Sequence, residues 1–172
     1  MRFFFANIII FFLFINISEA NNEIRFIDIN YIVNNSISGK NLNQIIQEKN
    51  KKITSELKTL GKKLEEQKNK IVSQKNILKK EDLYNLVKVY ENEVQKFNEI
   101  RKKMRDEFNS FNIKSKKKII DLLNPLITNY LKKESIQMLL QKDKIVFGND
   151  NLDITKEILK LFDDKHKKIQ FE

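Results

Sequence analysis

The stretch LGKKLEEQKNKIVSQKNILKK, residues 60–80, decides the fold because two patterns overlap in it. Seven of its 21 residues are lysine and only two are glutamate. Apolar or long side chains also recur at steps of three and four: Leu60, Leu64, Gln67, Ile71, Gln74 and Leu78. This spacing predicts a helix that packs along one seam and is basic on its remaining surface.

The same seam extends toward the N-terminus as far as Leu42. The step from Ile53 to Leu57 follows another step of four, and such a stutter locally unwinds a coiled coil. Gly61 lies inside the same helix and weakens it by about 1 kcal/mol relative to alanine. We therefore predict a compliant point in the helix near Gly61.

A second seam follows a short link and keeps the four-three spacing throughout. Its positions are Leu83, Val87, Tyr90, Val94, Phe97, Arg101, Met104, Phe108, Phe111, Ser115, Lys118 and Leu122. We interpret its large apolar residues as seam core rather than as a binding surface. Pro125 disfavours helical geometry at Asn124, so the second helix is expected to end there. The prediction is an antiparallel hairpin of helices 42–79 and 82–123, each about 60 Å long. One continuous helix is the alternative.

Three segments outside the hairpin have the pattern of short strands. They are residues 24–33 (IRFIDINYIV), residues 135–141 and residues 145–148. Residues 34–40 would connect the first strand to the hairpin, and residues 142–144 would form a tight turn between the other two.

Short helices complete the predicted body. One follows Pro125 and covers residues 125–134, and another covers residues 154–162, where Asp153 is the expected N-cap. The tail from residue 163 onward is expected to fray.

The body therefore consists of residues 21–41 and 124–172, and the arm of residues 42–123. A core this small rarely supplies more than a few kcal/mol of stability, and short strands leave unpaired edges. The chain has no cysteine, so disulfides cannot compensate. We expect association of several copies through the body. The predicted fold class is α+β, with a small oligomeric β-barrel body and one long antiparallel helical hairpin per subunit.

Residues 1–20 have the pattern of a secretory signal peptide. Arg2 precedes an apolar run over residues 3–17, and Ser18-Glu19-Ala20 offers small residues for cleavage. The run is short for a permanent membrane span, which needs about 20 apolar residues. Export and cleavage after Ala20 are predicted; an uncleaved signal anchor is the alternative.

The order of these parts resembles the OmpH/Skp family of periplasmic chaperones. The resemblance is carried by the first strand, by the step SISGKNL (residues 36–42) and by the ending KIVFGNDNLDITKEILKLF (residues 144–162). It implies a homotrimer whose strands form a common barrel and whose arms enclose a cavity. It also implies an ATP-independent chaperone in the periplasm that holds unfolded outer-membrane β-barrel proteins. An anionic membrane or lipopolysaccharide is a further partner that the family suggests, with no residue assigned here.

The charge of the chain is concentrated on the first helix and the tip. Residues 49–80 contain eleven lysines and three glutamates, a net charge of +8, whereas the whole chain has a net charge of +10. We predict that one lysine cluster captures acidic or unfolded chains by its combined field. Its members are Lys62, Lys63, Lys68, Lys70, Lys75, Lys79 and Lys80. For any one of these lysines taken alone, the alternative interpretation is an ordinary helix face exposed to solvent.

Other functions receive less support from the sequence. The only histidine, His166, has no second histidine or cysteine to form a metal site, and no nucleotide-binding loop is present. We therefore expect no enzyme activity, no cofactor and no metal. A basic nucleic-acid-binding protein conflicts with the export signal, and no specific nucleic acid is expected. A structural coiled-coil spacer of the cell envelope would explain the seams with steps of three and four, but not the strands predicted at both ends of the hairpin.

Overall fold

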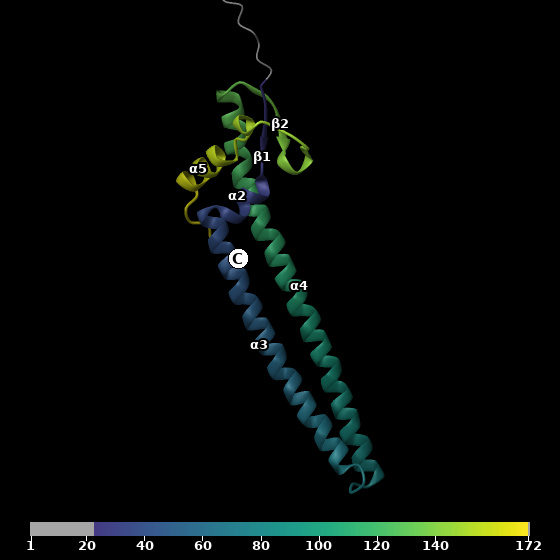
Figure 1. Cartoon of the computed structure of the whole chain (residues 1–172). Helices are drawn as coiled ribbons and strands as arrows, with labels where there is room; N and C mark the ends of the chain where they lie inside the picture. Colours follow the sequence, from purple (N-terminus) through teal and green to yellow (C-terminus); the bar gives the residue numbers. More distant parts are fainter. Residues whose placement is uncertain (1–22, 172) are drawn as a thin grey trace, which may run out of the picture.

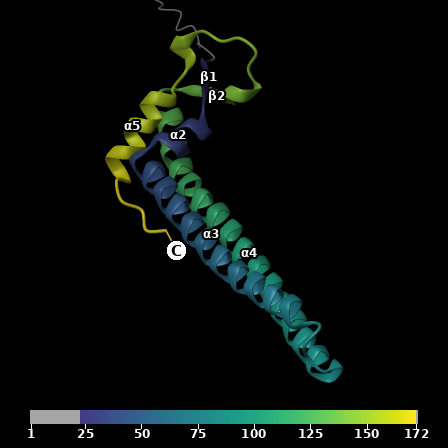
Figure 2. The same cartoon turned by 60° about the horizontal axis from the view of Figure 1, so that its bottom comes forward.

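The computed structural model describes residues 23–171, which form a small body and one long projecting arm (Figure 1). The predicted signal peptide lies outside the described residues. The arm consists of helix α3 (Ile37–Gln74) and the N-terminal part of helix α4 (Lys80–Lys133), which run side by side from the tip to the body (Figure 2). At 1.5 Å per residue, α3 is about 57 Å long and α4 about 81 Å, so α4 continues from the arm into the body. Among residues 23–171, no helix is long and apolar enough to cross a membrane.

The body contains a parallel two-stranded sheet of β1 (Glu23–Ile27) and β2 (Ile136–Gln141). Two helices, α2 (Ile29–Asn35) and α5 (Thr155–Lys165), pack with the C-terminal part of α4. Two single-turn 3-10 helices, η1 (Lys142–Lys144) and η2 (Asp150–Leu152), lie between β2 and α5. The core side chains that are almost completely buried come from α2, α3, α4, α5 and β1: Ile27, Ile32, Leu42, Ile119, Leu123, Ile158 and Phe162.

The first predicted strand is only half correct, because β1 ends at Ile27 and α2 follows it. Asp28 produces this switch: its carboxylate accepts a hydrogen bond from the amide of Tyr31 at 2.8 Å and so caps α2. Ser36 caps α3 in the same way by accepting from the amide of Gly39. The expected connection therefore contains the end of one helix and the start of the next, and the arm helix begins at Ile37 rather than at Leu42.

The prediction that Asn124-Pro125 ends the second helix is wrong, because α4 continues through Pro125 to Lys133. A proline inside a helix removes a backbone hydrogen bond and costs about 3 kcal/mol. Leu123 and Ile127 lie on either side of it and are buried in the body core. Their burial offsets this cost, and the helix expected at residues 125–134 is the last part of α4.

The end of the chain differs from prediction at two places. Residues 135–141 do contain a strand, β2, but residues 145–148 form no strand within the described chain. The tail is also not frayed throughout, because Ile169 is buried with only 8% of its surface exposed. Both differences have a tertiary cause that the local sequence does not contain. Residues 145–148 have no strand partner in the described part of the chain, and Ile169 packs into the core.

Candidate binding surface on the arm

One seam of partly buried side chains holds the two arm helices together. Phe111 is buried, and Phe97, Met104 and Phe108 are half-buried, as the seam prediction requires. Two helices alone cannot enclose a side chain completely, which explains why most of the seam stays half-buried. The ammonium of Lys49 lies 4.5 Å from the centre of the Phe111 ring, so this charged residue can occupy a seam position through a cation–π contact.

The seven lysines predicted to capture other chains are all exposed. They lie on the distal half of α3, in the turn at residues 75–79 and at the first position of α4. None of them pairs with a carboxylate among the described residues, and the ion pairs of the arm lie further along α4. Their positive charge is therefore not neutralised locally. The lysines are spread along the surface and do not converge on one pocket.

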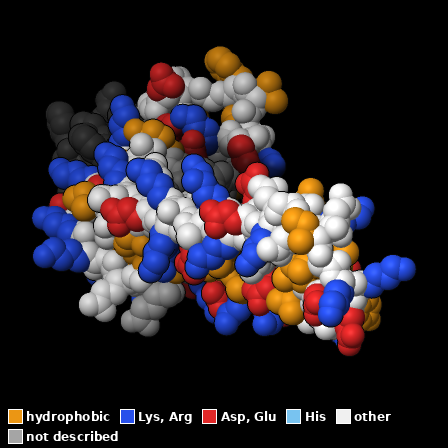
Figure 3. Space-filling model, turned by 90° about the horizontal axis from the view of Figure 1, so that it is seen from below, with side chains coloured by type: hydrophobic (Ala, Val, Ile, Leu, Met, Phe, Trp, Pro, Cys, Tyr) orange, Lys and Arg blue, Asp and Glu red, His pale blue; other side chains and the backbone are white. Residues whose placement is uncertain are grey.

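Four exposed apolar side chains surround the arm tip, and sequence reasoning missed them. Ile77 in the turn is 81% exposed, and Val72, Tyr84 and Val89 are each more than half exposed. Figure 3, seen from the tip end, shows hydrophobic side chains between basic and acidic ones at this end of the arm. The sequence did contain a signal for two of them. Val72 and Tyr84 directly follow the seam residues Ile71 and Leu83, so they fall outside the seam and are expected to be exposed.

The arm has shallow grooves rather than a deep pocket. One groove of ≈ 170 Å³ near the tip is lined by Gln67, Lys70, Ile71, Leu86, Val89 and Tyr90. A second, of ≈ 220 Å³, lies on the seam closer to the body and includes Ile53, Met104 and Phe108. Small-molecule sites are typically about 300–1,000 Å³ and well enclosed. This surface suits contact with an extended chain better than capture of one small ligand.

Gly61 lies inside α3, which is uninterrupted at this point. A methyl group added at Gly61 would meet no atom within 4 Å. Packing therefore gives no reason for glycine at this position. Its proposed role as a compliant point stays a prediction.

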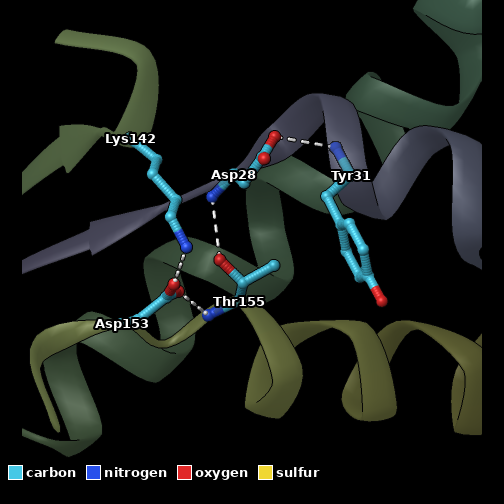
Figure 4. A network of polar contacts seen from close by, with 5 residues as sticks. All are labelled: Asp28, Tyr31, Lys142, Asp153 and Thr155. Atoms are coloured by element: carbon cyan, nitrogen blue, oxygen red, sulfur yellow. Dashed lines mark hydrogen bonds and ion pairs between the residues drawn. The ribbon is translucent and has the colours of Figure 1, made fainter. Parts of the chain in front are cut away.

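A second cluster of polar residues joins three elements of the body (Figure 4). The ammonium of Lys142 donates to Oδ2 of Asp153 at 2.5 Å, and Oδ1 of Asp153 accepts from the amide of Thr155 at 2.9 Å. The hydroxyl of Thr155 in turn accepts from the amide of Asp28 at 2.8 Å. Asp153 thus supports the start of α5 as predicted, although Ile154 is the residue at the N-cap position. No sequence pattern indicated Lys142 as the partner of Asp153.

These polar contacts also shift two pKa values. Burial would raise the pKa of Asp153, but hydrogen bonds from Lys142 and Thr155 together hold it below the ordinary value. The hydrogen bond to Asp153, together with its negative charge, raises the pKa of Lys142. Both shifts favour the ion pair.

The same residues line a polar hollow of ≈ 540 Å³ beside α5. In its wall, Asp28 caps α2 and Asp153 accepts from the first amide of α5, which gives the hollow a structural explanation. Within residues 23–171, no three potential ligands are grouped so that they could hold a metal ion. The ring of His166 lies 5.2 Å from that of Phe162 and packs against it.

Together these features define a class of protein: a small mixed body that carries a long, basic, two-helix arm. The chain belongs to the OmpH-like family of outer membrane proteins, whose model matches residues 23–162. The resemblance inferred from the sequence is therefore confirmed.

A solved structure has the same fold. It is the crystal structure of a candidate outer membrane chaperone (OmpH-like) from Caulobacter crescentus CB15, with a TM-score of 0.79 and 15% sequence identity. The similarity covers 87% of this chain and 89% of that one. No curated protein matched the sequence.

Proposed function

We propose that this protein is a periplasmic holding chaperone that binds unfolded outer-membrane β-barrel proteins without ATP and prevents their aggregation. Membership of the OmpH-like family supports a chaperone role. The predicted signal peptide supports export. The observation that carries the proposal is the arm surface, where unpaired lysines and exposed apolar side chains occur together far from the body.

The chemistry of the arm fits such clients. Unfolded outer-membrane strands alternate apolar and polar residues, so they can contact both kinds of side chain on the arm. The lysine cluster raises the local concentration of acidic segments, and lysine stems can cover apolar groups while their ammonium groups stay in water. Many weak contacts on a shallow surface allow one protein to bind many sequences and to release them again.

The body supports association into the proposed homotrimer. Its sheet has only two strands, and the outer edge of β1 carries a single bridge, between Phe26 and Asp153, so both edges of the sheet stay largely open among the described residues. Val146 and Phe147 follow β2 and are almost completely exposed, at 105% and 92%. Neighbouring subunits could bury both side chains and pair with residues 145–148, which would complete a common barrel. Three arms, each an antiparallel hairpin of two helices, would then surround one cavity.

The proposal is tested with residues 21–172 and a urea-unfolded outer-membrane β-barrel protein. The client is diluted from urea with and without the chain, at low and moderate salt, and its aggregation is followed by light scattering. Suppression near one oligomer per client would support the holding function, and weaker suppression at higher salt would assign capture to the lysines. No suppression at any salt would overturn the proposal and favour a structural spacer of the cell envelope.

A further inference from the structure

The residues after α5 run back onto the root of the arm. We call residues 166–171 the C-terminal strap, and the first turn of α3 together with the facing part of α4 the arm root. Figures 1 and 2 both show the strap leaving α5 and lying beside the upper part of α3. The family match ends at Phe162, so the strap lies beyond it.

Polar contacts attach this region to both arm helices in turn. At the end of α5, Oδ1 of Asp163 accepts from the amide of Ile37 at 2.8 Å, which satisfies one free donor at the start of α3. The hydroxyl of Ser38 donates to the carbonyl oxygen of His166. Further along the strap, the ammonium of Lys118 on α4 donates to the carbonyl oxygen of Gln170 at 2.9 Å. The strap therefore bridges α3 and α4.

Apolar packing strengthens the same attachment. Ile169 is buried and belongs to one core cluster with Leu42 of α3 and with Phe111 and Ile119 of α4. Phe171 packs against this cluster, whereas the intervening Gln170 is exposed. Alternation of inward and outward side chains is the pattern of an extended segment lying on a surface. The strap thus contributes to the core at the place where the arm leaves the body.

We propose that the C-terminal strap is a clamp that fixes the direction of the arm. The arm acts as a long lever: with α3 about 57 Å long, a rotation of about 10° at the root would displace the tip by about 10 Å. Contacts at the root therefore control the position of the binding surface. In the proposed trimer, which this last step assumes, the strap determines how wide the cavity between the arms is and thus which client sizes fit.

Pulsed electron paramagnetic resonance tests the clamp without any client. The chain has no cysteine, so spin labels can be placed at Asn50→Cys on α3 and Lys160→Cys on α5. Both side chains are exposed, and labelled chains are mixed with excess unlabelled chain to isolate distances within one subunit. The distance distribution is compared in four proteins: the parent, Ile169→Ala, a variant ending at Lys165, and Gln170→Asp. The last is the matched control, since its side chain is exposed and its backbone contact is kept.

The clamp predicts at least a twofold broader distribution in Ile169→Ala and in the shortened variant, with Gln170→Asp unchanged. Hydrogen exchange at the amides of residues 37–40 should become at least tenfold faster in the same two variants. Unchanged distances and exchange in both would overturn the clamp. Global loss of helical circular dichroism in Ile169→Ala would also overturn it, since the strap would then be an ordinary part of the core. Neither readout depends on chaperone activity, so the two proposals can fail separately.

Discussion

The ammonium of Lys142 lies 2.5 Å from Oδ2 of Asp153 and links the end of β2 to the start of α5. The pKa of Asp153 is held below its ordinary value of 3.8, and the pKa of Lys142 is raised above 10.5. A lowered carboxyl pKa stabilises the fold above pH 3.8, and this stability is lost as the pH falls through the folded pKa. The raised lysine pKa stabilises the fold below pH 10.5, and this stability is lost as the pH rises through the folded value.

We predict that Asp153→Asn lowers the free energy of unfolding by a constant amount between about pH 5 and pH 9. The difference from the parent should shrink as the pH falls from 3.8 through the lower folded pKa of Asp153, and as it rises from 10.5 through the higher folded pKa of Lys142, because the parent then loses the ion pair as well. Urea unfolding followed by circular dichroism across this pH range measures it. Asp153→Ala also removes the acceptor for the amide of Thr155 and should cost about 1 kcal/mol more at neutral pH. Equal stabilities of parent and Asp153→Asn at pH 7 would contradict this account.

The arm was largely predictable because its seam is a local, repeated pattern. Steps of three and four identified both helices and most of the buried or half-buried positions along them, including Phe111 and Phe108. The predicted seam positions Arg101 and Lys118 are exposed instead, and the neighbour of Lys118, Ile119, is the buried residue. The lysine cluster was also visible in the sequence, and all its members are exposed as expected. What the sequence could not show is the exposure of Ile77, since that depends on how the turn between α3 and α4 directs its side chain.

The body was less predictable because tertiary contacts decide its local structure. Pro125 is a helix breaker by local rules, yet buried neighbours keep α4 helical through it. The run IRFIDINYIV has strand-forming residues on both sides of Asp28, and only the cap formed by Asp28 separates strand from helix. Residues 145–148 have a strand pattern but no strand partner within residues 23–171, and the packing of Ile169 into the core has no local signature.

Gly39 and Gly61 are both in α3 but should respond oppositely to alanine. A methyl group at Gly39 would lie 2.0 Å from the carbonyl oxygen of Val33 at the close approach of α2 and α3, whereas Gly61 faces open space. Gly39→Ala should destabilise the protein by about 1–3 kcal/mol through overpacking. Gly61→Ala should stabilise the arm helix by up to about 1 kcal/mol. Urea unfolding of the two variants measures both, and a neutral Gly39→Ala would show that the approach is not tight.

If Gly61 is needed for compliance, Gly61→Ala should hold clients less well despite its higher stability. The aggregation assay described above measures this at equal oligomer concentrations. Alanine at the exposed neighbour Thr59 is a suitable control, because it removes a β-branched residue and leaves the glycine in place. Full activity of Gly61→Ala would reject compliance at this residue.

Phe147→Asp should prevent association without unfolding the single chain. The side chain is 92% exposed, so its replacement removes few contacts within the subunit, but a carboxylate could not be buried against a neighbouring body. Sedimentation velocity should show the parent as an oligomer and Phe147→Asp as a monomer with parent-like helical circular dichroism. Ile77→Asp at the arm tip is the matched control, since it introduces the same charge at a similarly exposed apolar residue. A monomeric parent, or an oligomeric Phe147→Asp, would contradict association through this loop.

The last prediction concerns the lysine cluster itself. Replacing its seven lysines by glutamine should slow client capture on the order of tenfold at low salt, because electrostatic steering raises association rates by about that factor or more. The effect should fade at physiological salt, where charges are screened beyond about 8 Å. Stopped-flow fluorescence of a labelled client measures the capture rate at each salt concentration.

A control variant with the same loss of charge separates the cluster from net charge. It replaces seven exposed lysines of the body by glutamine: Lys132, Lys133, Lys144, Lys156, Lys160, Lys167 and Lys168. If position on the arm matters, this control should capture clients nearly as fast as the parent and keep the salt dependence. If both variants slow capture equally, only the total charge steers the client. If neither does, apolar contacts such as those of Ile77 and Tyr84 at the tip carry the capture step.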